Sequence, residues 1–191
     1  MIYLLDAGAT LVQFIVGLYL MLVLLRFLFQ LVRADFYNPL SQAIVTLTNP
    51  PLRVLRKIVP GFAGIDWPSI ILLVSIQALE LFLLGLMVSG KAPAPAGLFV
   101  LSIAHLLQLS AYLYMFLIFI LVVTSWISPG AYNPLTVLIY QLTDPLMRRI
   151  RKKVPTTAGL DLSPMVALLG IYLFMSLIVA PLMDLGHSLA K

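Results

Sequence analysis

Cysteine is absent from this chain of 191 residues, and charged side chains are scarce, at 10% of the total. Without cysteine there is no disulfide scaffold, thiolate metal site or cysteine nucleophile. Soluble domains carry about 25% charged and about 45–50% apolar residues, whereas 62% of the residues here are hydrophobic and the mean hydropathy is +1.08. The composition excludes an ordinary soluble enzyme, a nucleic-acid-binding domain and a disordered tail, and it indicates a polytopic membrane protein.

Motifs of catalysis and of metal binding are missing as well. The two histidines, His105 and His187, are too few and too far apart in the sequence for a metal or haem site. The chain contains no phosphate-binding loop, nucleophile elbow or zinc motif. We therefore predict a protein that is not an enzyme, with no catalytic residue and no cofactor.

Long apolar runs are what the chain has instead, and four of them reach the roughly 20 residues that a membrane-spanning helix needs. They predict an all-α fold with spans at about 8–32, 68–88, 98–127 and 164–185. The first run has no basic start and is longer than the core of a signal peptide. We therefore expect it to be retained as the first span.

Basic residues fall in the connections between spans. Of twelve Lys and Arg residues, four lie between spans one and two and five between spans three and four, whereas the connection between spans two and three holds only Lys91. Loops rich in Lys and Arg stay on the cytoplasmic side. We therefore predict that both basic loops are cytoplasmic and that both termini lie on the other side of the membrane.

The two basic loops are copies of each other. A shift of 95 residues aligns positions 37–66 with 132–161 and gives 16 identities in 30. This degree of identity indicates an internal duplication. Since each half has two spans, the halves share one orientation, and this is a parallel repeat. We place the first repeat at 1–90, a Pro/Ala-rich linker at 91–97 and the second repeat at 98–191.

The repeated block resembles the YggT family (YlmG in some bacteria and in plastids). The YNPL block, the Asn/Asp-Pro break, the basic run that ends in Val-Pro and the Ala-Gly-Ile/Leu-Asp start of the next span carry the resemblance. It covers essentially the whole chain, as two copies of a two-span unit. It implies a protein of the bacterial inner membrane or of plastid membranes. In an inner membrane, the charge distribution between the spans places both termini on the periplasmic side. The resemblance also implies a role in cell division, osmotic or ion homeostasis, or cytochrome maturation, and it carries over no catalytic residue.

Each basic loop is predicted to form a pair of short amphipathic helices. Asn38-Pro39 and Asn133-Pro134 match a helix N-cap followed by proline at the first helical position. Asn49-Pro50 and Asp144-Pro145 are expected to end that helix and to start a second one. The expected apolar stripes are Leu40, Ile44, Leu47, Leu52, Leu55 and Ile58 in the first loop, and Leu135, Ile139, Leu142, Met147 and Ile150 in the second.

A helix with an apolar and a cationic side beside a membrane is typical of the membrane interface, where its cations meet anionic headgroups. The alternative is that the cations only set the topology. Nucleic acid is not an expected partner, because the basic surface is split into two short loops without an RNA-binding module. The candidate residues for binding anionic lipid or a protein partner are Arg53, Arg56, Lys57, Arg148, Arg149, Arg151, Lys152 and Lys153.

Four polar side chains inside the spans are the remaining candidates: Arg26, Gln77, Glu80 and His105. Arg26 can extend its side chain to the interface. Glu80 must be protonated or paired, and its candidate partners are Arg26 and His105. Gln77 lies one turn from Glu80 on the same face. The group fits either a proton or cation relay or a structural hydrogen bond between helices.

These observations favour a non-enzymatic membrane protein that organises membrane complexes or assists their assembly, with its basic loops bound to anionic lipid or to a protein partner. The alternative is a small channel or transporter, or a subunit of one, for ions or osmotic balance, with Glu80, Gln77 and Arg26 on the path. Four helices enclose too little interior for a pore, so a conducting form would be a homo-oligomer.

Overall fold

The computed structural model describes residues 2–62, 64–127, 133–154 and 161–191, and within them it contains helices and no strand. The motif positions Ala63, Tyr132, Pro155 and Ala158-Gly159 lie outside the described residues. The helices are α1 (Ile2–Val32), α2 (Pro39–Ile58), α3 (Trp67–Ser89), α4 (Pro95–Ile127), α5 (Pro134–Arg151), α6 (Ser163–Phe174), the π-helical segment η1 (Met175–Val179) and α7 (Ala180–Leu189).

Four helical stretches in the described residues are long and apolar enough to cross a membrane, as predicted. They cover Asp6–Val32, Trp67–Val88, Pro95–Ile127 and Ser163–Leu189. Only 11–28% of the most apolar window of each stretch is buried inside the protein. Such extensive exposed apolar surface fits a bundle that is surrounded by lipid. The third stretch starts inside the predicted 91–97 linker, because proline is well suited to the first turn of a helix.

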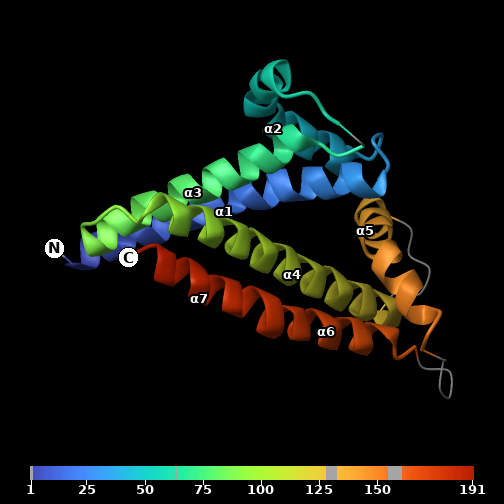
Figure 1. The fold of residues 1–191 in the computed structure, drawn as a ribbon. Coiled ribbons are helices and arrows are strands. Elements are labelled where there is room, and N and C mark those ends of the chain that lie inside the picture. Colours follow the sequence, from blue (N-terminus) through green and yellow to red (C-terminus); the bar gives the residue numbers. More distant parts are fainter. Residues whose placement is uncertain (1, 63, 128–132, 155–160) are drawn as a thin grey trace.

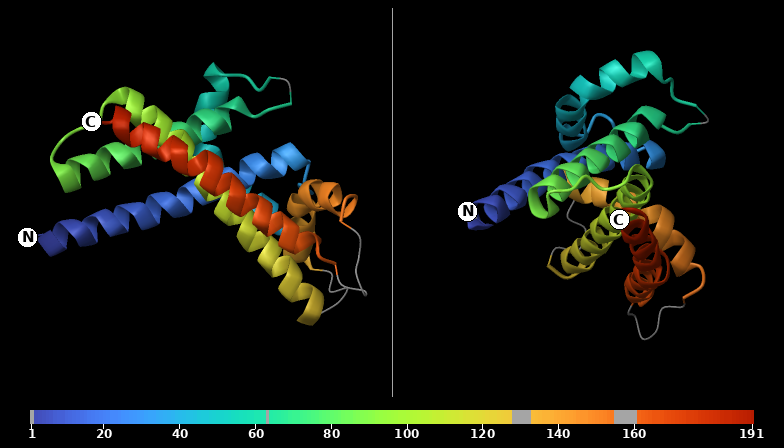
Figure 2. Two further views of the ribbon diagram at one scale, coloured as in Figure 1. Left: turned by 60° about the horizontal axis from the view of Figure 1, so that its bottom comes forward. Right: turned by 60° about the vertical axis from the view of Figure 1, so that its left-hand side comes forward.

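The spans form two helical hairpins. α1 packs along α3, and α4 packs along α6, η1 and α7, while the contact between α3 and α4 joins the two hairpins. The hairpins cross at an angle (Figure 2). α2 and α5 lie at the same end of the bundle, and both termini lie at the opposite end (Figure 1). Both basic loops are therefore on one side of the spans, as a parallel repeat requires.

Each basic loop forms one helix, so the predicted pair of helices is wrong. α2 continues through Pro50 and Pro51, and α5 continues through Pro145. A proline removes a backbone hydrogen bond and can bend a helix without ending it. Figure 2 shows α2 turning sharply near its middle. Pro50 and Pro51 thus redirect α2 without ending it.

The predicted N-caps of both helices are confirmed. The Asn38 side chain accepts a hydrogen bond from the amide of Leu40 at 2.9 Å. Asn133 accepts one from the amide of Thr136, also at 2.9 Å, and Thr136 completes a capping box by accepting from the amide of Asn133. Because these caps satisfy amides that have no partner within the helix, each helix has a defined start at its Asn-Pro pair.

The main core lies in the half of the bundle that carries α2 and α5. Its buried apolar side chains come from both hairpins and from the two basic helices. α2 and α5 therefore complete the core of the protein. The buried members are Leu20, Val23, Leu24, Leu28 and Phe29 (α1), Leu52 (α2), Leu72 and Leu73 (α3), Leu113, Leu117, Ile118 and Leu121 (α4), Leu138, Ile139, Leu142 and Met147 (α5) and Ala167 (α6).

Candidate functional site

The basic end of the bundle is the surface formed by α2, α5 and the two lysines that follow α5. All eight predicted cations on it are exposed to solvent: Arg53, Arg56, Lys57, Arg148, Arg149, Arg151, Lys152 and Lys153. They share one end of the molecule because α2 and α5 do (Figure 1). The fold therefore gathers into one surface the charges that the sequence divides between two loops.

Three sides of α2 have different surroundings. One side packs against the spans and holds the buried Thr48 and Leu52. A second side is apolar and exposed. It has two members seven residues apart before the bend and two members four residues apart after it, so each pair lies on one face of its half of the helix. A third side carries the cations. The exposed apolar row consists of Leu40, Leu47, Val54 and Ile58.

The predicted apolar stripes face the protein more than expected. In α2, Leu52 is fully buried, and Ile44 and Leu55 pack against the core. In α5, Ile139, Leu142 and Met147 are buried, so most of its stripe lies in the core and not in a membrane interface. The physical reason is that α5 lies between the two hairpins and contacts α1, α4 and α6. Of the two basic helices, α2 is the one that offers an apolar row to lipid.

Arg26 joins the first span to the basic end. Its guanidinium donates from Nη1 to the Val45 carbonyl oxygen at 3.0 Å and to Thr48 Oγ1 at 2.8 Å, and from Nη2 to Asn49 Oδ1 at 3.0 Å. The side chain is 6% exposed. It therefore does not reach solvent, and its hydrogen bonds go to α2 and not to Glu80. Sequence reasoning missed its partners Thr48 and Asn49.

The Arg26 contacts fall on the turn just before the double proline of α2. Pro50 and Pro51 have no amide hydrogen, so this part of the helix lacks backbone donors. The carbonyls that lose an amide partner are those of Thr46 and Leu47, so the guanidinium does not replace the missing bonds. It holds this turn through the Val45 carbonyl and the side chains of Thr48 and Asn49. In the second repeat, a leucine (Leu121) occupies the place of Arg26, and a leucine (Leu146) occupies the place of the second proline. The arginine and the extra proline thus occur together, in the first repeat alone.

In each repeat, an ion pair at equivalent positions joins the basic helix to the span that follows it. Arg56 Nη2 lies 2.7 Å from Asp66 Oδ2, and Arg151 Nε lies 2.9 Å from Asp161 Oδ2. Both pairs join residues ten apart, and each fixes the end of a basic helix to the start of the following span. Sequence reasoning gave the two aspartates no role. The 95-residue shift aligns Asp66 with Asp161 and Arg56 with Arg151. This repetition is the sequence pattern that could have identified the two ion pairs.

The two pairs differ in their surroundings. The Asp66 side chain is 3% exposed and also accepts a hydrogen bond from Ser69 Oγ at 2.7 Å. The Asp161 side chain is 36% exposed. Although burial alone would raise it, hydrogen bonds from Ser163 and the charge of Arg151 hold the pKa of the Asp161 carboxyl below its ordinary value. The stabilisation from this carboxylate is present at neutral pH and is lost as the pH falls through its folded-state pKa.

Glu80 lines a small cavity between α1, α3 and α4, and the cavity opens to the surroundings at Tyr112, which is 52% exposed. Gln77 Nε2 donates to Glu80 Oε2 at 2.8 Å. Both side chains line a cavity of about 180 Å³ together with His105, Gln108 and Tyr112 from α4. The structure therefore brings together three of the four predicted intramembrane residues and leaves Arg26 apart from them. Gln108 and Tyr112 were missed, although they follow His105 at the helical spacing of three and seven residues.

The described residues provide no set of ligands for a metal ion. They contain no group of three His, Asp or Glu side chains that could hold an ion. What the chemistry of the described sites offers is a cationic surface at one end of the bundle and one hydrogen-bonded carboxyl group within the spans.

Known proteins similar to this chain cover nearly its whole length. The CCB3/YggT family model matches two tandem segments, residues 5–87 and 100–182. The chain is 44% identical over 180 residues to "Uncharacterized protein PA0392" of Pseudomonas aeruginosa, with 94% of this chain and 91% of the relative covered. It is 32% identical over 178 residues to "Uncharacterized protein YggT" of Escherichia coli K12, with 92% and 90% covered. No solved structure matches it.

Proposed function

The chain belongs to the CCB3/YggT family, and we propose that it is a non-enzymatic inner-membrane protein that binds the anionic cytoplasmic leaflet through α2 and α5 while it organises membrane complexes or assists their assembly. The observation that carries this proposal is the gathering of eight exposed cations at one end of four apolar spans. Each Lys or Arg near an anionic membrane surface contributes about 1 kcal/mol of attraction.

The attachment of the basic helices to the spans supports this proposal. Arg26 holds α2 to α1, and the Arg56–Asp66 pair holds it to α3. At its other end, Asn38 Nδ2 donates to the carbonyl oxygen of Pro134 at 2.7 Å, which joins α2 to α5. A cationic surface that is fixed relative to the spans keeps its charges at one depth. This is what docking to headgroups requires.

The apolar row of α2 supplies the second element of an interfacial helix. Leu40, Leu47, Val54 and Ile58 are exposed beside the cations of the same helix. Burying apolar side chains in the membrane interface adds to the electrostatic attraction. In this proposal α2 lies in the interface, while α5 fills the end of the bundle and presents its cations to the headgroups.

Replacing Arg53 and Lys57 with Gln should release α2 from anionic vesicles. Loss of two cations removes about 2 kcal/mol of attraction, which is about a thirtyfold change in the docking equilibrium. The measurement is the rate at which chymotrypsin cleaves after the exposed aromatic residues that flank α2, namely Phe36, Tyr37 and Phe62. The variant should be cleaved faster than the wild type in vesicles that contain phosphatidylglycerol, and at the same rate in vesicles of phosphatidylcholine alone.

Chymotrypsin is suited to this comparison because the substitutions remove trypsin sites and leave its own sites unchanged. The matched control replaces Lys152 and Lys153 with Gln, which removes equal charge at the end of α5. Equal cleavage of variant and wild type in anionic vesicles would contradict interfacial docking of α2. If crosslinking in native membranes instead captures an acidic protein on α2 and the variant loses it, the surface serves a protein partner.

A small channel or transporter for ions is the alternative function. The polar cavity around Glu80 favours it, since ionisable side chains within spans often mark ion paths. Arg26, however, which was expected on the same path, makes its hydrogen bonds with α2. Ion flux into liposomes that contain the purified protein, abolished by Glu80→Gln, would favour transport over the proposed function.

A further inference from the structure

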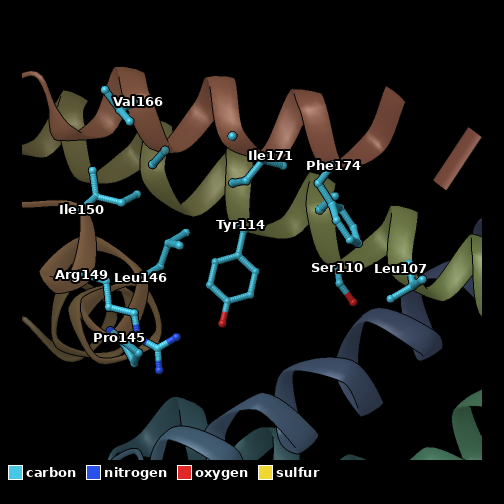
Figure 3. A pocket seen from close by; sticks show the side chains of 13 residues that line it. Leu107, Ser110, Tyr114, Pro145, Leu146, Arg149, Ile150, Val166, Ile171 and Phe174 are labelled. Atoms are coloured by element: carbon cyan, nitrogen blue, oxygen red, sulfur yellow. The ribbon is translucent and has the colours of Figure 1, made fainter. Parts of the chain in front are cut away.

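A groove runs along the second hairpin beside the basic end. It has a volume of about 510 Å³ and is lined by residues of α4, α5 and α6. This lies within the range of about 300–1,000 Å³ that is typical of ligand sites. Figure 3 shows Arg149 at one end of the groove, Tyr114 in its middle, and Ser110 and Phe174 toward its other end.

The long axis of the groove follows the spans. Ser110 and Tyr114 on α4, and Gly170 and Phe174 on α6, are each four residues apart and so line one face of their helix. A lining built in this way extends parallel to the helices. Acyl chains in a bilayer run in the same direction. Because Gly170 is exposed, the groove is open to its surroundings, which in a membrane are lipid tails.

Small residues create the hollow, and only the second repeat has all of them. Ala111, Ala167 and Gly170 line the groove. At the equivalent positions the first repeat has the larger residues Val16, Leu72 and Ser75. The groove is therefore a property of the second hairpin and not a general consequence of the duplicated fold.

Arg149 supplies the charged end. It is exposed, and no hydrogen bond or ion pair joins it to another described residue. Two neighbouring arginines are paired, Arg148 with Asp144 at 3.5 Å and Arg151 with Asp161 at 2.9 Å. The residue equivalent to Arg149 in the first repeat is Val54. Arg149 and the small residues that form the groove thus occur together in the second repeat, and the first repeat has neither.

We propose that this groove binds one anionic phospholipid, with an acyl chain along α4 and α6 and the phosphate at Arg149. A guanidinium binds phosphate oxygens through two parallel hydrogen bonds, with both geometric fit and opposite charge. The inference rests on the proposed function in one respect, since Arg149 belongs to the basic surface that faces anionic headgroups. It goes further by assigning a single lipid site to the second repeat.

Native mass spectrometry of the full-length protein in mild detergent tests this site. The protein is incubated with equal amounts of phosphatidylglycerol and phosphatidylcholine, and the lipid that stays bound is counted. We expect one phosphatidylglycerol per chain. Arg149→Gln should reduce the bound fraction about five- to tenfold, because it removes one cation and its paired hydrogen bonds. Lys191→Gln, which removes an equal charge at the opposite end of the bundle, is the matched control and should bind as the wild type does.

Gly170→Leu tests the hollow without changing charge. A Cβ added at Gly170 would meet no other atom within 4 Å, so the new side chain fits the backbone and fills the groove. We expect at least a fivefold loss of bound phosphatidylglycerol with unchanged helicity by circular dichroism. If this variant fails to fold, the comparison of Arg149→Gln with Lys191→Gln decides alone.

The site would be overturned by phosphatidylglycerol retention at the wild-type level in Arg149→Gln, or by equal retention of the two lipids in the wild type. Protection of α2 from chymotrypsin, measured on the same variants, distinguishes a failure of the groove proposal from a failure of the proposed function. Loss of the retained lipid with α2 still protected supports the groove by itself. Retained lipid together with an unprotected α2 would support the groove and contradict the docking of α2.

Discussion

Replacing Arg26 with leucine should lower the free energy of unfolding by about 3 kcal/mol, because the substitution removes three hydrogen bonds from a charged donor to α2. Each such bond contributes about 1.5–3 kcal/mol. Part of this loss is offset, since a buried cation no longer has to be removed from water. The second repeat has leucine at the equivalent position, Leu121, so the new residue suits this place in the fold.

The measurement is denaturation of the purified protein in mixed micelles, followed by circular dichroism. Arg26→Lys should give an intermediate loss, because an ammonium group keeps the charge but lacks the geometry to reach all three acceptors. Arg53→Gln, on the exposed side of α2, is the control and should stay within about 0.5 kcal/mol of the wild type. An Arg26→Leu protein as stable as the wild type would contradict the assigned role.

Arg56→Gln should cost about 1–2 kcal/mol, and Arg151→Gln less than about 1 kcal/mol, although the two arginines are equivalent in the repeat. Losing Arg56 leaves the carboxylate of Asp66 buried with Ser69 as its side-chain partner. The Arg56 side chain is itself 40% exposed, so the cost stays below that of a fully buried pair. Arg151 and Asp161 are 48% and 36% exposed, and solvent screens their attraction.

The same denaturation experiment compares the two variants, and the internal repeat supplies the matched control. A double-mutant cycle with Asp66→Asn isolates the pairwise interaction from other effects of each change. We expect a coupling near 1 kcal/mol for the first pair and a smaller one for the second. Equal losses for Arg56→Gln and Arg151→Gln would contradict the argument that burial separates the two pairs.

The spans, the duplication and the N-caps could be predicted because each depends on local sequence. Twenty apolar residues cross a bilayer whatever packs beside them, and an Asn-Pro pair starts a helix through its own backbone geometry. The gathering of both basic helices at one end follows in the same way, since an even number of spans separates Arg53 from Arg148.

The predictions that were wrong or incomplete concern which surroundings, lipid or another part of the protein, contact a given side chain. Periodicity identified the apolar side of α5, but it does not state whether lipid or protein covers that side, and Ile139 and Leu142 proved to be core residues. Pro50 was expected to end a helix because its local effect opposes helical geometry. The hydrogen bonds from Arg26, 24 positions earlier, support that turn through tertiary contact. No local pattern reveals such a contact.

The depth of α2 in the membrane tests the central claim most directly. The chain has no cysteine, so single nitroxide labels can be placed at Leu47→Cys, on the exposed apolar row, and at Arg53→Cys, on the cationic side. In vesicles that contain phosphatidylglycerol, the label at 47 should collide with oxygen dissolved in the lipid, and the label at 53 with a nickel complex dissolved in water. Labels equally accessible to the aqueous reagent would contradict an interfacial α2.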